Sequence, residues 1–289
     1  IADAPGHEQY TRNMVTAAAG SDAAVVLVDI TKLDTTARPV ALLPQTRRHA
    51  LLAHLLRVPS IVFAINKLDA IEQPQAAYEA VRDALLGFTE QAGIRVAGII
   101  PVSALRGDNV TQPLDAPWYD GPSLLQLLES LPTTQERPTG NLLIPVQYVA
   151  REGEGTGNQP RTLWGRIAHG QVKAGDQVQL FPSGEIATVA EVRRAGEVVD
   201  SCAAGESAGL VLDRQLDVSR GDWIATPQSI KDSNRFSATL AWLDTEPAVV
   251  GRKYWVRHGN RWVQARISAI ESRLDIHTLE ATDAHELAV

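Results

Sequence analysis

The chain has 289 residues, of which 44% are hydrophobic and 21% charged, and its formal net charge is −7. This length and composition predict two or three domains with cores of their own, and the negative charge argues against broad nonspecific binding to nucleic acid. No apolar run approaches the ~20 residues of a membrane helix, and no charged-then-apolar leader precedes Asp3. We therefore expect a cytoplasmic protein that binds neither membrane nor nucleic acid.

The first 132 residues alternate between buried-looking strands and stretches with helical patterns. The expected strands cover residues 24–30, 60–65 and 98–102, and the expected helices cover residues 45–57, 73–92 and a segment that begins at Pro122. Such alternation predicts an α/β domain in which a parallel sheet is covered by helices on both faces. The chain also starts within a strand-like pair, Ile1-Ala2, so we expect the sequence to be part of a longer protein.

The pattern changes after a linker predicted at residues 133–141. Short β-like runs separated by turn residues predict a small β-barrel over residues 142–227, with strands at 144–149, 162–169, 177–181, 187–192, 207–212 and 222–225. After a polar linker at 228–234, expected strands at 236–243, 253–257 and 262–270 indicate a partial second barrel over residues 235–289 with open edges.

The segment from Asp3 through Ala4, Pro5 and Gly6 to His7 follows the first strand-like residues. A carboxylate at a strand end can hold Mg²⁺ through water, and a glycine turn can offer its N–H to a terminal phosphate. Asp-x-Pro-Gly is also ordinary turn chemistry, and in isolation the turn is the more economical interpretation.

Two further segments are suited to binding a guanine base. Asn66, Lys67, Leu68 and Asp69 close the second apolar run, and Ser103, Ala104 and Leu105 close the third. One carboxylate can accept hydrogen bonds from both guanine donors, which places Asp69 as the base-selecting residue. Asn66 would tie the base to the neighbouring loop, and the aliphatic stem of Lys67 would cover the ring. Each motif alone is weak, but all three segments follow apolar strands, where open α/β sheets bind ligands. Together they predict a nucleotide site.

The residues around these motifs resemble those of one family of translation-factor-type GTPases, the large, GTP-binding subunits of bacterial sulfate adenylyltransferase. The resemblance rests on residues 7–14, 45–49, 103–110, 117–119, 145–149, 182–184 and 217–222. It implies a P-loop GTPase-like domain followed by β-barrels, and it covers the chain nearly end to end. Trp118 and Tyr119 are either an interface anchor or a loop packed on its own domain.

The resemblance also implies a function. A small catalytic subunit would form adenylyl sulfate from ATP and sulfate, while this subunit would hydrolyse GTP to drive that reaction through a conformational change. Gly6 would contact the γ-phosphate, His7 would orient the attacking water, and residues 6–14 would form the switch that the partner senses. GTP and Mg²⁺ are the implied ligands, with Asp3 holding the metal through water.

Two departures and two alternatives accompany this interpretation. The Gly-rich phosphate loop and the first switch threonine are absent from these residues, so we expect the sequence as given to hydrolyse GTP poorly or not at all. One alternative is a translation elongation GTPase, although residues 8–12 differ from the sequence that is usual at this position in elongation GTPases. The other is a non-hydrolysing interaction protein on a decayed nucleotide fold.

Overall fold

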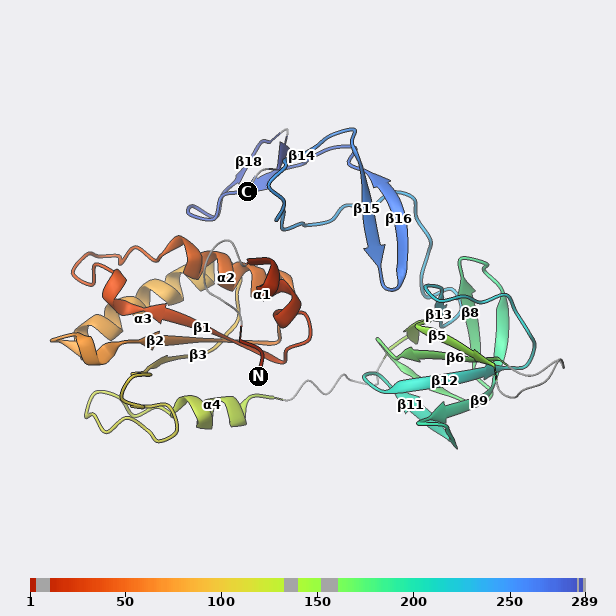
Figure 1. Cartoon of the computed structure of the whole chain (residues 1–289), viewed down its shortest axis with the longest axis horizontal. Coiled ribbons are helices and arrows are strands. Elements are labelled where there is room, and N and C mark those ends of the chain that lie inside the picture. The colour runs from red at the N-terminus through yellow and green to blue at the C-terminus, as the bar shows by residue number, and fades with distance from the viewer. Residues whose placement is uncertain (4–10, 133–139, 152–160, 285, 288–289) are drawn as a thin grey trace. The chain divides into compact units, whose positions relative to one another are not determined.

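The computed structural model describes residues 1–3, 11–132, 140–151, 161–284 and 286–287. Its contacts divide the chain into two compact units (Figure 1). One unit comprises residues 1–134 with 240–250 and 269–289, and the other comprises residues 135–239 with 251–268. The predicted domain boundaries stay predictions. Among the described residues, no helix combines the length and apolarity needed to span a membrane.

A three-stranded parallel sheet forms the centre of the first unit. Its strands are β1 (Ala23–Asp29), β2 (Ser60–Asn66) and β3 (Val96–Pro101), with β2 in the middle. β2 is almost continuously apolar because both of its faces are covered. The register pairs Asp29 with Asn66, so the carboxyl ends of β1 and β2 lie side by side.

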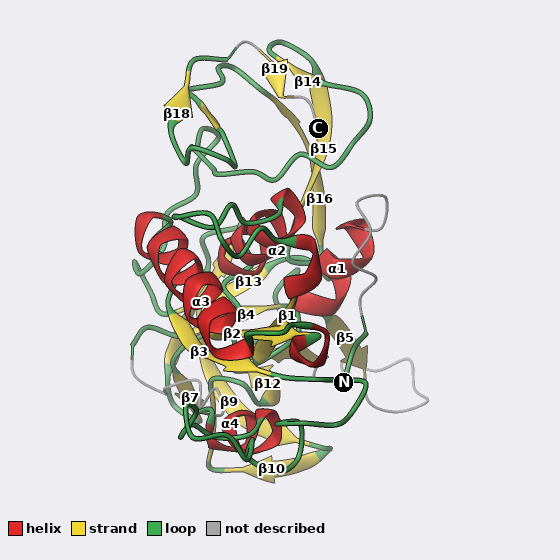
Figure 2. Ribbon diagram, turned by 90° about the vertical axis from the view of Figure 1, so that its left-hand side faces the viewer, coloured by secondary structure: helices red, strands yellow, loops and turns green. Residues whose placement is uncertain are grey.

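Helices cover both faces of this sheet, as the alternation predicted. α2 (Pro44–Leu55) and α3 (Pro74–Gln91) pack on the face that carries Ile61, Phe63 and Ile65. α4 (Leu124–Ser130) packs on the opposite face, where Leu127 meets Val62 and Ala64. Figures 1 and 2 show α2 and α3 on one side of β1–β3 and α4 on the other. The short elements α1 (Thr11–Ala18), η2 (Ile30–Lys32) and η3 (Leu68–Ala70) complete the unit.

The second unit is built around an antiparallel barrel. Its strands are β4 (Leu143–Pro145), β5 (Tyr148–Arg151), β6 (Arg161–Arg166), β7 (Gln171–Lys173), β8 (Gln177–Phe181), β9 (Ile186–Arg194), β10 (Glu197–Val199), β11 (Ser201–Ala203), β12 (Ser207–Leu212) and β13 (Trp223–Ala225). Seven of them are hydrogen-bonded in the order β4-β13-β8-β9-β12-β6-β5, β10 pairs with β9, and β7 and β11 form a separate pair. β4 and β5 end this path, yet only two residues separate them in the chain, so the sheet closes on itself.

Gly165 allows the close approach at this closure. A Cβ at Gly165 would clash with the carbonyl oxygen of Pro145, so β4 and β6 can meet there only without a side chain. The barrel interior is apolar and includes Ile144, Leu210 and Ile224, all fully buried. The predicted barrel is therefore confirmed as an antiparallel β-rich module.

The C-terminal segment contains short strands and one longer hairpin. The hairpin joins β15 (Lys253–His258) and β16 (Arg261–Arg266), and the two-residue strands are β14 (Ala248–Val249), β17 (Arg273–Leu274), β18 (Ala281–Thr282) and β19 (Glu286–Leu287). The strand expected at 236–243 was wrong. The structure assigns no strand to that segment, and Phe236 and Leu240 are exposed, so burial of these side chains does not stabilise an extended conformation there.

Candidate functional site

The carboxyl edge of the parallel sheet brings together the polar residues that follow β1, β2 and β3. Asp29 ends β1, Asn66 ends β2, and Ser103 follows β3 by two residues. The backbone of Val102 donates to Ile65 O at 2.8 Å, which keeps the third loop beside the second. Open α/β sheets bind ligands at this edge.

Asn66 holds two loops together with one oxygen. Its Oδ1 accepts hydrogen bonds from the backbone N–H of Lys67 at 2.8 Å and of Ala104 at 2.9 Å. Lys67 has a φ of 70°, in the left-handed region that disfavours residues with a Cβ. The bond from Asn66 helps to stabilise that backbone, so the side chain fixes the loop conformation before any ligand arrives.

Asp69 is oriented by the third loop. The hydroxyl of Ser103, which is 2% exposed, donates to Asp69 Oδ1 at 2.6 Å. Ser103 Oγ in turn accepts from the N–H of Arg106 at 3.2 Å. The second carboxylate oxygen of Asp69 has no partner in the described part of the chain. A half-buried carboxylate held in this way can accept a pair of donors such as N1–H and the exocyclic amine of guanine.

Sequence reasoning missed Asp29. Its Oδ2 lies 2.7 Å from Lys67 Nζ, and its Oδ1 accepts from both the N–H and the hydroxyl of Thr31. Burial raises the pKa of Asp29, but the hydrogen bonds from Lys67 and Thr31 outweigh burial and hold the pKa below its usual value of 3.8. The signal available in the sequence was an acidic residue at a strand end, the same signal that singled out Asp3.

The two remaining residues of these loops differ in burial. Leu68 is 8% exposed and packs into the core that contains Phe63 and Ile65. Leu105 is 87% exposed, next to the loop that Asn66 holds. An exposed leucine beside a paired polar cluster offers an apolar surface for a flat ring.

The phosphate-binding half of the predicted site stays a prediction. Ala4, Pro5, Gly6 and His7 lie outside the described residues, as do the side chains of Thr11 and Arg12. Asp3 is exposed and forms no hydrogen bond within the described structure. The residues that the model describes contain no group of three or more His, Cys, Asp or Glu side chains suited to a metal. Among the described residues, Asp3 is the one that would hold Mg²⁺ through water.

The loop before α4 packs on its own domain. Tyr78 of α3 lies 5.6 Å from Trp118 and 6.1 Å from Tyr119, measured between ring centroids. Tyr78 also donates its hydroxyl to Ile99 O at 2.8 Å, and burial raises its pKa to about 12. Of the two interpretations of Trp118 and Tyr119, the structure supports intradomain packing.

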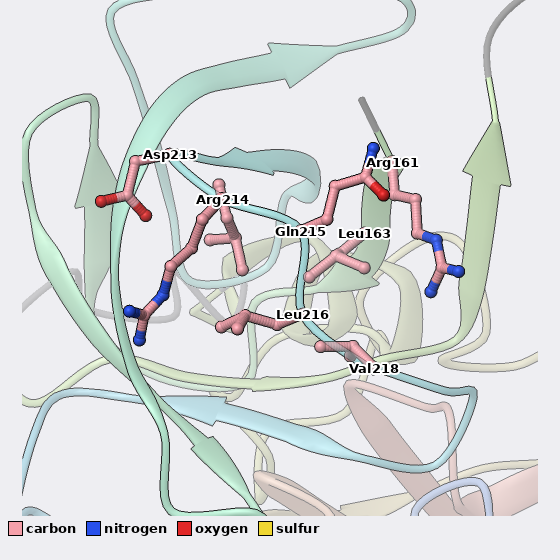
Figure 3. A pocket seen from close by; sticks show the side chains of 8 residues that line it. Arg161, Leu163, Asp213, Arg214, Gln215, Leu216 and Val218 are labelled. Atoms are coloured by element: carbon pink, nitrogen blue, oxygen red, sulfur yellow. The ribbon is translucent and has the colours of Figure 1, made fainter. Parts of the chain in front are cut away.

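A recess on the barrel has fewer polar groups available to a ligand than the sheet edge has. Figure 3 shows that it is lined by Arg161, Leu163 and residues of the segment after β12. Arg214 there donates to Ile186 O, and Asp213 accepts from the N–H of Thr188. Two of its charged side chains are thus already engaged by the barrel backbone.

Comparison with known proteins agrees with this geometry. Residues 1–134 match the model of the elongation factor Tu GTP binding domain, and residues 235–288 match that of the GTP-eEF1A C-terminal domain-like family. The first 134 residues are thus similar to the GTP-binding domain of translation-factor-type GTPases. The predicted fold class is confirmed, and the polar loops lie at the carboxyl edge of the sheet of this domain.

Several curated relatives that match the chain are sulfate adenylyltransferase subunit 1 proteins. Over the whole chain it is 38% identical to sulfate adenylyltransferase subunit 1 of Laribacter hongkongensis, of which it covers 58%. It is 41% identical over 99% of its length to subunit 1 of Rhizobium meliloti, covering 55%, and 38% identical over 99% to the bifunctional enzyme CysN/CysC of Xylella fastidiosa, covering 44%. The resemblance stated from the sequence is confirmed. The chain spans little more than half the length of the subunit 1 relatives.

Proposed function

We propose that this chain is the GTP-binding part of a sulfate adenylyltransferase large subunit. The observation that supports the proposal is the pair of loops joined by Asn66, in which the hydroxyl of Ser103 holds the carboxylate of Asp69. The chain also matches a sulfate adenylyltransferase subunit 1 over its whole length, which is 58% of that relative. By this likeness, a separate small subunit would act on ATP and sulfate.

GTP would bind with its base between the two loops. Asp69 accepts the two guanine donors, the stem of Lys67 covers one face of the ring, and Leu105 contacts it from the neighbouring loop. Adenine presents no matching pair of donors, so the carboxylate of Asp69 would be left facing an acceptor. Selectivity against ATP follows from this mismatch.

Hydrolysis would act on the partner through residues 6–14. Gly6 would contact the γ-phosphate, His7 would orient the attacking water, and loss of the γ-phosphate would release the segment. Mg²⁺, held by Asp3 through water, would neutralise phosphate charge when bound. The free energy of GTP hydrolysis would thus favour adenylyl sulfate formation in a heteromer located in the cytoplasm.

The test uses the product of the complete gene, purified together with the small catalytic subunit of the same organism. We expect GTP to increase the yield of adenylyl sulfate from ATP and sulfate, and we expect His7→Ala to remove the increase while GTP still binds. A yield that GTP does not change would contradict the proposal. Binding of aminoacyl-tRNA instead would favour an elongation factor.

A further inference from the structure

The β15–β16 hairpin has two faces of different chemistry. The register pairs Lys253 with Arg266, Trp255 with Gln264 and Arg257 with Trp262, so these six side chains share one face. We call it the outer face. The opposite face carries Tyr254, Val256, Val263 and Ala265, three of which are half-buried.

The hairpin tip is anchored within its own unit. His258 stacks on Trp223 of β13 with ring centroids 4.9 Å apart and an interplanar angle of 25°. Arg261 Nη1 lies 3.4 Å from Asp222 Oδ1. The hairpin therefore presents its faces in a defined orientation on the barrel rather than as a free ribbon.

The outer face exposes two tryptophans. Trp255 is 64% and Trp262 is 58% exposed. Burying an indole ring is worth several times more than burying a small side chain, so leaving two of them in water is costly. The apolar inner face, not the outer one, has the alternation of a barrel interior, which means that a core would take Tyr254 and Val256 and leave the tryptophans outside.

The same face is positively charged. Neither strand contains an acidic residue, and Lys253, Arg257 and Arg266 form no salt bridge with any residue that the model describes. The guanidinium of Arg257 lies 6.0 Å from the ring centroid of Trp262, which gives it an aromatic neighbour but no counter-charge. This cationic face occurs on a chain whose net charge is −7.

We propose that the outer face binds an acidic surface of the small catalytic subunit. The proposal rests on the proposed function, which supplies a protein partner. Tryptophan and arginine are the residues that most often carry binding energy at protein interfaces, and unpaired cations add charge complementarity. A single strand of nucleic acid would also suit tryptophans with cations, but the acidic chain as a whole repels it.

The experiment measures binding of the complete gene product to the purified small subunit by surface plasmon resonance. We expect Trp255→Ala with Trp262→Ala, and separately Lys253→Glu with Arg266→Glu, to weaken binding by about tenfold or more. Wild-type binding should weaken with salt, and the charge-reversed variant should lose much of that dependence. GTP affinity should stay unchanged in all variants, because none of these residues belongs to the base-binding loops.

Matched controls separate the face from exposure in general. Tyr148→Ala removes an aromatic side chain that is also 64% exposed, but from the barrel strand β5. Arg95→Glu reverses an exposed charge that precedes β3. Both should bind the small subunit as the wild type does. The charge-reversed variant keeps both tryptophans, and the tryptophan variant keeps every charge, so a folding defect in one leaves the other informative.

The outcomes are distinct. Wild-type affinity in both outer-face variants, with a wild-type protein that does bind the small subunit, would overturn the inference. Tight binding of a single-stranded oligonucleotide that both variants lose, with subunit binding intact, would overturn it in favour of nucleic acid. A wild-type protein that does not bind the small subunit at all would instead contradict the proposed function.

Discussion

The loops at the carboxyl edge of the parallel sheet, proposed to bind the base, and the outer face of the β15–β16 hairpin both carry polar groups, but only those of the loops are paired within their own domain. In the loops, Asn66, Ser103 and Asp29 each hold a neighbour through hydrogen bonds within the domain. On the outer face, Lys253 and Arg266 lie opposite each other and form no salt bridge with any described residue. Internal pairing builds a rigid site for a small ligand, whereas unpaired charge beside exposed tryptophan marks a surface for a larger one.

The largest expected effect is on GTP affinity, from a change at Asp69, the residue proposed to select the base. Asp69→Asn places an amide nitrogen against the guanine donors, so we expect GTP affinity to fall about 100-fold, or about 3 kcal/mol. Titration with a fluorescent GTP analogue measures it in the complete gene product. Asp83→Asn, an exposed change on α3, is the control and should bind normally. Unchanged affinity in Asp69→Asn would remove the base-selecting role.

A somewhat smaller effect follows from separating the two loops. Asn66→Ala removes hydrogen bonds to Lys67 and Ala104, which together contribute about 2 kcal/mol. We expect GTP binding to weaken by about 10- to 30-fold. Hydrogen exchange should also show faster exchange of the Ala104 amide without ligand, and protection equal to the wild type there would contradict a preformed loop.

Asp29→Asn tests the ion pair with Lys67 and should have a modest effect. Lys67 is about half exposed, so the pair contributes about 0.5 to 1 kcal/mol and GTP affinity should fall at most about fivefold. Because the folded pKa of Asp29 is lowered, its contribution to stability is present above pH 3.8 and is lost as pH falls further. Chemical denaturation at pH 7 and pH 3 should show the variant and wild type converging in acid.

The smallest expected effect is on stability, from removing two charges of the outer face. Lys253→Gln with Arg266→Gln removes charges that form no salt bridge within the described part of the chain, so the free energy of unfolding should change by less than about 0.5 kcal/mol. Chemical denaturation of the same protein measures it. A larger loss would show that these cations have partners in the folded chain, and the contrast with the loops would then fail.

Local patterns predicted much of the architecture. The strands at 177–181 and 207–212 lie where the β-like runs placed them, and β2 differs from its expected range by one residue. These predictions succeeded because each run is set by its own alternation or continuous apolarity. The segment 236–243 has a similar pattern but forms no strand, and its Phe236 and Leu240 stay exposed, because a local pattern does not guarantee burial.

The sequence predicted which residues form the proposed base-binding loops, but it did not predict the hydrogen bonds between them. The sequence singled out Asn66, Asp69 and Ser103, and the structure shows what joins them. Asp29 escaped notice because its partner Lys67 is 38 residues away, and only the parallel pairing of β1 with β2 brings them together. The sequence also left two interpretations of Trp118 and Tyr119, because Tyr78, on which they pack, is distant from them in the chain.

By itself the sequence determined the order of elements, the class of both main domains and the residue types that suit a guanine base. These properties depend on neighbours close in the chain, whose spacing the sequence states directly. Only the tertiary structure decided which carboxylate holds Lys67, how Ser103 orients Asp69 and which hairpin face keeps its cations unpaired. Each of those features depends on contacts between segments that are distant in the chain. The register of strand pairing determines which of these side chains form hydrogen bonds and which are buried.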